Sequence, residues 1–322
     1  MSRISLALLA SVYLMSCKED DKDTVFSGSA KLAATSVSAP ASVPTLTAVD
    51  AKLELASFIP SPRISASLTK LLQSDDDGAV DDADNDEGDG SSDAPVPTEE
   101  EDAVSSCLQV QVEGVKLKAY GDTVSFDATL DAAACIASSF KEANATEVKI
   151  EKAIISTYLE ASCEGKDFSA LNGKTLKEAA TALEGECEGK ITNFESSLSS
   201  SKGTITLAGQ TIKFDIETTT ANSKSDGTAC VATIANGVRT ENGCVSVEKT
   251  VDAIDPTNNS FRKTTSNNLT WNEANPGDYY DSGSFSVVVN NWSGTITYSG
   301  ATTPPTFSIT NGTTTETGTL IY

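Results

Sequence analysis

Histidine is absent from this chain, and cationic side chains are scarce. Without an imidazole, the Ser-His-Asp triad, the Cys-His nucleophile pair and every histidine-ligated zinc or haem site are excluded. The 322 residues include 23 Lys and Arg against 46 Asp and Glu, a formal net charge of -23. Nucleic-acid binding needs basic residues that neutralise phosphates, so no nucleic-acid partner is expected. A Gly-x-Ser-x-Gly motif and a P-loop are also missing, and we predict that the chain is not an enzyme.

The chain begins with an apolar segment that is too short to span a bilayer. Residues 4 to 15 are apolar apart from small Ser and one Tyr, which is typical of a cleaved signal peptide, here residues 1 to 16. The segment ends in Leu14-Met15-Ser16-Cys17, which resembles the lipobox of bacterial lipoproteins. That resemblance implies that Cys17 is the site of lipid attachment. It also implies a chain anchored in the bacterial outer membrane, with a body that is periplasmic or surface-exposed.

The composition of residues 17 to 102 predicts a disordered tether. Residues 24 to 74 are rich in Ala, Ser, Thr and Pro, and they bury too little apolar surface to offset the entropy of ordering them. Residues 75 to 102 include fourteen acidic residues and no basic ones, so this acidic block repels itself and stays extended. Apolar side chains at helical spacing predict one short helix over residues 62 to 73. A flexible tether of this length would hold the body about 50 Å from the membrane.

The acidic block contains a candidate calcium site. Its Asp-x-Asp spacing with a following Gly resembles a shortened thrombospondin type 3 calcium repeat, and calcium prefers six to eight oxygen ligands. The candidate ligands are Asp75, Asp77, Asp81, Asp82, Asp84 and Asp86. The repeat's paired cysteines are missing here, so a polyanionic spacer that binds divalent ions loosely is the alternative. No other cofactor is expected.

Six cysteines after Cys17 predict a disulfide framework, because an exported protein meets an oxidising environment. They are Cys107, Cys135, Cys163, Cys187, Cys230 and Cys244. We favour bonds between nearest neighbours, because short loops close most easily, which gives the pairs 107 with 135, 163 with 187 and 230 with 244. Asn236-Gly237 predicts a hairpin turn inside the last pair. A bulge at Gly243 would then be needed to bring the two thiols opposite each other.

The rest of the sequence predicts a mainly β fold of the α+β class, arranged as an antiparallel sandwich or a meander. Apolar and polar residues alternate over residues 124 to 130 and again from residue 203 onward. A short helical insertion is expected at residues 175 to 183, where Thr175 and Glu178 can form a capping box. We divide the body into a disulfide-braced α+β half, 103 to 200, and a β-rich half, 201 to 322; the two halves together could be one domain.

Aromatic residues are only 6% of the chain, but several gather near its C-terminal end among Asn, Thr, Ser and Gly. An exposed row of rings beside amides and hydroxyls would bind sugars. The candidate ligand-binding residues are Trp271, Tyr279, Tyr280 and Trp292. A sheet core with polar loops is the alternative.

The function expected from these patterns is that of a membrane-anchored envelope or cell-surface lipoprotein. Its partners would be the membrane, through the lipid, and a protein or glycan at the cell envelope. We therefore favour a structural or protein-contact role over the two hypotheses that follow. A glycan-binding or calcium-dependent adhesion module is the alternative. A carboxylate-dependent hydrolase is the third, because two carboxylates can hydrolyse a glycoside without histidine.

Overall fold

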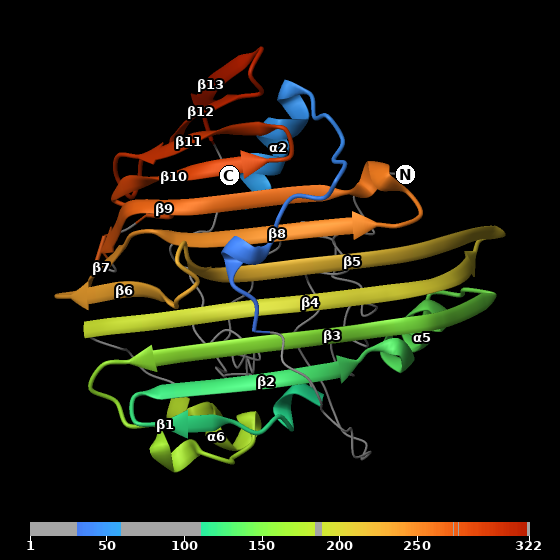
Figure 1. The fold of residues 1–322 in the computed structure, drawn as a ribbon, viewed down its shortest axis with the longest axis horizontal. Helices are drawn as coiled ribbons and strands as arrows, with labels where there is room; N and C mark the ends of the chain where they lie inside the picture. Colours follow the sequence, from blue (N-terminus) through green and yellow to red (C-terminus); the bar gives the residue numbers. More distant parts are fainter. Residues whose placement is uncertain (1–30, 59–110, 184–188, 273, 276, 321–322) are drawn as a thin grey trace, which may run out of the picture.

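A single antiparallel β-sheet forms the body of the protein. The computed structural model describes residues 31–58, 111–183, 189–272, 274–275 and 277–320. The strands are β1 (Lys118–Tyr120), β2 (Thr123–Asp131), β3 (Glu147–Cys163), β4 (Gly189–Leu207), β5 (Gln210–Lys224), β6 (Cys230–Ala235), β7 (Val238–Glu241), β8 (Cys244–Asp252), β9 (Ser260–Asn272), β10 (Ser282–Val289), β11 (Trp292–Tyr298), β12 (Thr306–Thr310) and β13 (Thr315–Thr319). The helices are η1 (Ala34–Ser36), α2 (Ala48–Phe58), α5 (Ala133–Glu142), η4 (Ser169–Leu171), α6 (Leu176–Leu183) and η5 (Pro256–Asn258). The mainly β prediction is confirmed, and the strands follow one another as a meander (Figure 1).

The sheet changes partners near its middle. Its order is β1-β2-β3-β4-β5-β8-β9-β10-β11-β12-β13, and β6 and β7 pair with each other between β4 and β9. β5 and β6 lie along the same edge of β4, where Asn222 is opposite Glu195 and Cys230 is opposite Asn193. β7 and β8 lie one after the other along β9. The chain therefore leaves the sheet at the end of β5 and re-enters it at the start of β6.

Two local predictions from the sequence are confirmed. Asn236 and Gly237 have φ values of 53° and 72° and form the two-residue turn that joins β6 to β7. Such positive φ values are what Asn-Gly tolerates, and they match the twist of a hairpin. The capping box of α6 is also present: the Thr175 amide donates to Glu178 Oε2 at 2.7 Å, and the Glu178 amide donates to Thr175 Oγ1 at 3.2 Å.

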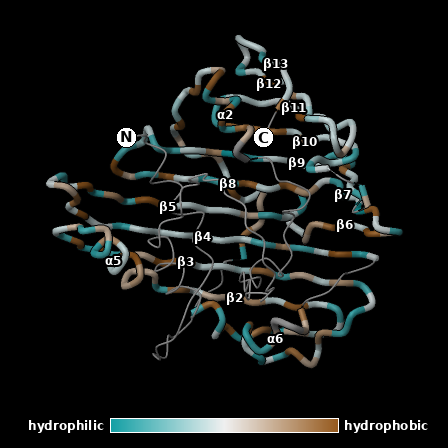
Figure 2. The backbone as a smooth tube through the Cα atoms, turned by 180° about the vertical axis from the view of Figure 1, so that it is seen from behind, coloured by the Kyte–Doolittle hydropathy of each residue, from teal (hydrophilic) through white to brown (hydrophobic). Residues whose placement is uncertain are grey.

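Cross-strand partners share a face of the sheet, so one row of them defines what that face presents. The row runs Leu159, Glu195, Asn222, Ser246, Thr264, Val287. Its two ends are apolar and its centre is polar. The hydropathy colours of Figure 2, which shows the molecule from behind, are correspondingly pale or teal along much of β4 and β5.

Each apolar end of this row belongs to a separate core. The α6 cluster is Val115, Leu117, Val124, Phe126, Ala128, Leu130, Leu159, Cys163, Phe168, Leu171, Leu176, Ala179 and Leu183. The α2 cluster is Ala51, Leu55, Leu269, Tyr280, Phe285, Val287, Val289, Trp292, Ile296, Tyr298, Phe307, Ile309 and Leu320. The sheet therefore buries apolar side chains at both ends of one face and leaves polar ones between them.

Residues 31–58, which we call the N-terminal strap, pack on the sheet. The Leu32 amide donates to Ser196 Oγ at 3.0 Å and the Ala34 amide to Ser223 Oγ at 2.9 Å. Ser196 follows Glu195 in the same strand, so these contacts lie on the opposite face from the polar row. In Figure 1 the blue strap runs in front of β4, β5 and β8.

The strap then passes around the turn between β10 and β11 and ends as α2 on the other face. The Asn290 side chain donates to the Pro44 carbonyl at 3.2 Å, and the Trp292 indole donates to the Leu46 carbonyl at 3.0 Å. An ion pair between Glu54 and Arg262 joins α2 to β9. The expected tether is thus wrong over residues 31–58, because α2 and the strap bury apolar side chains against the sheet. The expected helix over residues 62 to 73 lies outside the described residues.

Candidate functional site

A cavity of about 360 Å³ opens where the sheet changes partners. It lies on the face that carries the polar row, between the α6 cluster and the α2 cluster. Its polar lining comes mainly from four strands and consists of Asn193, Glu195, Thr220, Asn222, Ser246 and Thr264. β5 separates from β4 beyond Asn222. The cavity that these side chains line opens at that point.

Glu195 is the most unusual of these residues. Its side chain points into the cavity from β4, and burial raises the pKa of its carboxyl above the ordinary value. Among the described residues, burial is the only cause of that shift in pKa. In the part of the chain that the structure describes, no hydrogen bond or ion pair reaches the carboxylate. By its exposed area the side chain is half-buried, and a partly desolvated carboxylate without a donor favours any group that brings one.

An ion pair forms the wall that β7 contributes to the cavity. Arg239 Nη2 lies 3.2 Å from Glu241 Oε2, and the two side chains are 20% and 21% exposed. Because these two charges neutralise each other, the described lining keeps one uncompensated charge, the Glu195 carboxylate. The cavity is therefore suited to a cation rather than an anion.

Two buried thiols, Cys230 and Cys244, also line the cavity. The predicted disulfide between them is not formed, and both are free cysteines. The hairpin of β6 and β7 ends at Glu241, and β8, which starts at Cys244, pairs with β5 and β9 instead of β6. The break at Gly243, whose φ is 73°, nevertheless brings the thiols together. A hydrogen bond with Cys244, aided by burial, raises the pKa of Cys230 far above its ordinary value, so this thiol is a poor nucleophile.

The other predicted disulfides reach beyond the described residues. Cys135 and Cys163 are disulfide-bonded and buried. Their predicted partners, Cys107 and Cys187, lie outside the part of the chain that is described. These two pairings therefore stay predictions.

The four aromatic residues belong to or pack against the α2 cluster, as the sheet-core alternative expected, and do not form an exposed row. Trp292 is 2% exposed and Tyr280 is 8% exposed, while Trp271 and Tyr279 are partly buried against the same cluster. Of these four residues, only Tyr280 is in the described lining of the cavity. The ring of Phe285 also lines it, and the centres of the two rings lie 5.8 Å apart in an edge-on arrangement. A strand that alternates buried rings with exposed Ser and Thr places those rings in a core.

The lipid and calcium candidates cannot be placed by the fold. Cys17 and the six candidate calcium ligands, Asp75, Asp77, Asp81, Asp82, Asp84 and Asp86, lie outside the described residues. Elsewhere, the described ranges contain no group of three or more Cys, Asp or Glu that could hold a metal ion. In those same ranges no helix has the length and apolar character needed to cross a membrane.

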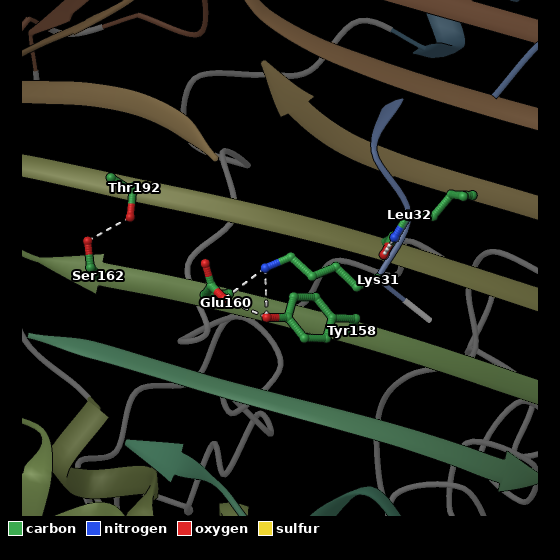
Figure 3. Close-up of polar contacts among 7 residues, drawn as sticks. Lys31, Leu32, Tyr158, Glu160, Ser162 and Thr192 are labelled. Carbon is green, nitrogen blue, oxygen red and sulfur yellow. Dashed lines mark hydrogen bonds and ion pairs between the residues drawn. The ribbon is translucent and has the colours of Figure 1, made fainter. Parts of the chain in front are cut away.

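Lys31 begins the described strap and joins it to β3 and β4 (Figure 3). Its ammonium group lies 3.1 Å from both Tyr158 Oη and Glu160 Oε2, and 4.7 and 4.9 Å from the ring centres of Tyr158 and Phe194. Burial alone would raise the pKa of Glu160, but hydrogen bonds from Tyr158 and Lys31 and the charge of Lys31 outweigh it and lower that pKa. The cluster fixes the described start of the strap on the sheet.

Replacing Lys31 by Met tests this contact. A lowered pKa of Glu160 contributes stability above the unfolded value of 4.5, and that contribution is lost as the pH falls through the folded value. Lys31→Met is expected to lower the free energy of unfolding at pH 7 by less than about 1 kcal/mol, because the pair is partly exposed. The substitution should also make the free energy of unfolding less dependent on pH between about pH 5 and 3, because a carboxyl titrates in about that range. Urea unfolding at each pH measures both effects, and equal pH dependence in Lys31→Met and the wild type would contradict the assignment.

The cavity could not be foreseen from the sequence. Residues 189 to 203 of β4 show no clear alternation, since Ser and Thr fill both faces. Three residues singled out from the sequence do line it, Cys230, Cys244 and Tyr280, but they were predicted for a disulfide and an aromatic row. Asn193, Glu195, Arg239 and Glu241 were missed because only long-range pairing brings them together.

No protein-family model, curated protein or solved structure matches this chain.

Proposed function

We propose that this chain is a bacterial envelope lipoprotein, held in the outer membrane by acyl chains on Cys17, whose sheet body contacts a partner at the membrane surface. The observation that supports it is the Leu14-Met15-Ser16-Cys17 motif at the end of a short apolar segment. Several acyl chains on one residue exceed what stable anchoring requires. The role of the body in this proposal is contact rather than catalysis.

The docking of the strap supports a body held close to the membrane. Lys31 follows Cys17 by only 14 residues, and from Lys31 onward the strap is attached to the sheet. Fourteen residues reach at most about 50 Å when fully extended. As a flexible chain they span about 20 Å on average. The body is therefore expected to sit within about its own width of the bilayer.

The same connectivity gives the acidic block a different place from the one its composition suggested. Residues 75 to 102 follow α2, which is docked on the sheet, and precede Gln111, whose side chain donates to the Asp131 carbonyl at 3.2 Å. The block is thus joined to the body at both ends and adds nothing to the distance between the lipid and the body.

Metabolic labelling with a fatty-acid analogue tests the anchor. We expect the wild type to be labelled and to sediment with membranes, and Cys17→Ser to be unlabelled and released into the soluble fraction. Cys244→Ser is the matched control, because it removes another thiol of the chain and should leave the label and the location unchanged. A Cys17→Ser protein that keeps the label, or an unlabelled wild type, would overturn the proposal.

A further inference from the structure

We propose that the cavity between the two cores binds a small hydroxylated organic amine, whose ammonium group pairs with the Glu195 carboxylate. The inference is independent of the lipid anchor, because it rests only on described residues of the sheet.

The charge of the cavity selects the ammonium group. Glu195 points into the space with no donor from the described protein, while the other two charged residues of the described lining, Arg239 and Glu241, pair with each other at 3.2 Å. A ligand ammonium would supply both the missing donors and the missing positive charge. Hydrogen bonds between ionised partners are roughly twice as strong as neutral ones, so this contact would dominate the affinity.

A metal ion fits the cavity less well than an organic cation. Calcium and magnesium take six or more oxygen ligands, usually including several carboxylates. The described lining offers one free carboxylate, and the described residues hold no cluster of three metal-binding acidic or thiol groups. One carboxylate is sufficient for an ammonium group, which has three donors in all.

The remaining lining selects hydroxyl groups on the ligand. Asn193 and Asn222 flank Glu195, and Ser246 and Thr264 continue the lining on the next two strands of the row. Amide and hydroxyl side chains both donate and accept hydrogen bonds. They can therefore form hydrogen bonds with ligand hydroxyls that donate and with ligand hydroxyls that accept. The rings of Tyr280 and Phe285 close the side that faces the α2 cluster, and aromatic faces attract both cations and the C–H faces of sugar-like molecules.

The size of the cavity agrees with a ligand of this class. Its volume of about 360 Å³ is at the lower end of the range for small-molecule sites. A molecule the size of one amino sugar fits such a volume and still leaves room for a few bridging waters. Glucosamine is therefore a suitable probe, and glucose is its matched control, because it has a hydroxyl where glucosamine has the ammonium group.

Titration calorimetry of the purified full chain tests the proposal. We expect saturable heat with glucosamine and at least about tenfold weaker binding of glucose, the factor that one charged hydrogen bond supplies. Glu195→Gln should weaken glucosamine binding by a similar factor without unfolding the protein, since it removes only a partly buried charge. Glu217→Gln changes an exposed carboxylate of β5 and should bind like the wild type.

Three results would overturn the proposal. The first is no saturable binding of glucosamine up to about 10 mM, which is weaker than the range useful for a specific site. The second is equal binding of glucose and glucosamine, which would remove the role of the ammonium group. The third is full affinity in Glu195→Gln, confirmed as folded by its circular dichroism, which would place the binding elsewhere.

Discussion

Replacing Leu55 by Ala should lower the free energy of unfolding by about 2 to 5 kcal/mol. Leu55 lies on α2, is 1% exposed, and packs into the α2 cluster against rings that include Trp292. The substitution removes buried methyl groups and leaves a space that neither the helix nor the sheet can close without moving the strap. Urea unfolding followed by circular dichroism and tryptophan fluorescence measures the loss.

The same helix offers a matched control for this experiment. Leu53 is 64% exposed, so Leu53→Ala removes the same atoms from solvent rather than from a core. Its effect should stay within about 0.5 kcal/mol, as for most surface substitutions. If the two variants lose the same stability, α2 does not dock on the sheet through Leu55.

Replacing Gly294 by Val should destabilise the sheet more strongly than most core substitutions. A Cβ atom at this position would lie 2.0 Å from the Ser308 carbonyl oxygen and 2.7 Å from the Ile309 Cα, both backbone atoms of β12. Backbone atoms cannot turn away as a flexible side chain can, so β11 and β12 would have to separate. We expect a loss of more than about 3 kcal/mol, the upper part of the range for overpacking.

Thermal unfolding of Gly294→Val measures this effect, and a second glycine serves as its control. Gly209 lies in the turn between β4 and β5 with a φ of 77°, and no atom lies within 4 Å of the position its Cβ would take. Asn tolerates such a conformation, so Gly209→Asn should cost no more than about 1 kcal/mol. A Gly294→Val protein as stable as Gly209→Asn would show that β11 and β12 are not paired as described.

The sequence was informative wherever a few neighbouring residues decide the conformation. Asn236-Gly237 fixes a hairpin because both residues accept positive φ, and Thr175 with Glu178 closes the start of α6 by two reciprocal hydrogen bonds. These signals need no knowledge of the rest of the chain. β9 has no such local signal, because its Ser, Thr and Asn residues are typical of loops and become a strand only through pairing with β8 and β10.

The candidate site lay beyond the sequence for the same physical reason. Glu195 and Asn222 are 27 positions apart, and they become neighbours only when β5 aligns on β4. The strap was misjudged because its Ala, Ser and Pro content is that of a disordered segment. Its small side chains pack against Ala221, Val245 and Val247 on a surface that composition does not reveal.

The course of the strap determines how a pull on the N-terminal end of the chain would load the body. Tension arriving at Lys31 meets contacts made one at a time across successive strands, first with Glu160, then with Ser196 and Ser223. Such contacts break one after another. The hydrogen bonds between the strands bear almost none of the force meanwhile. The first part of the body to give way would thus be the strap, and the sheet beneath it would keep its shape.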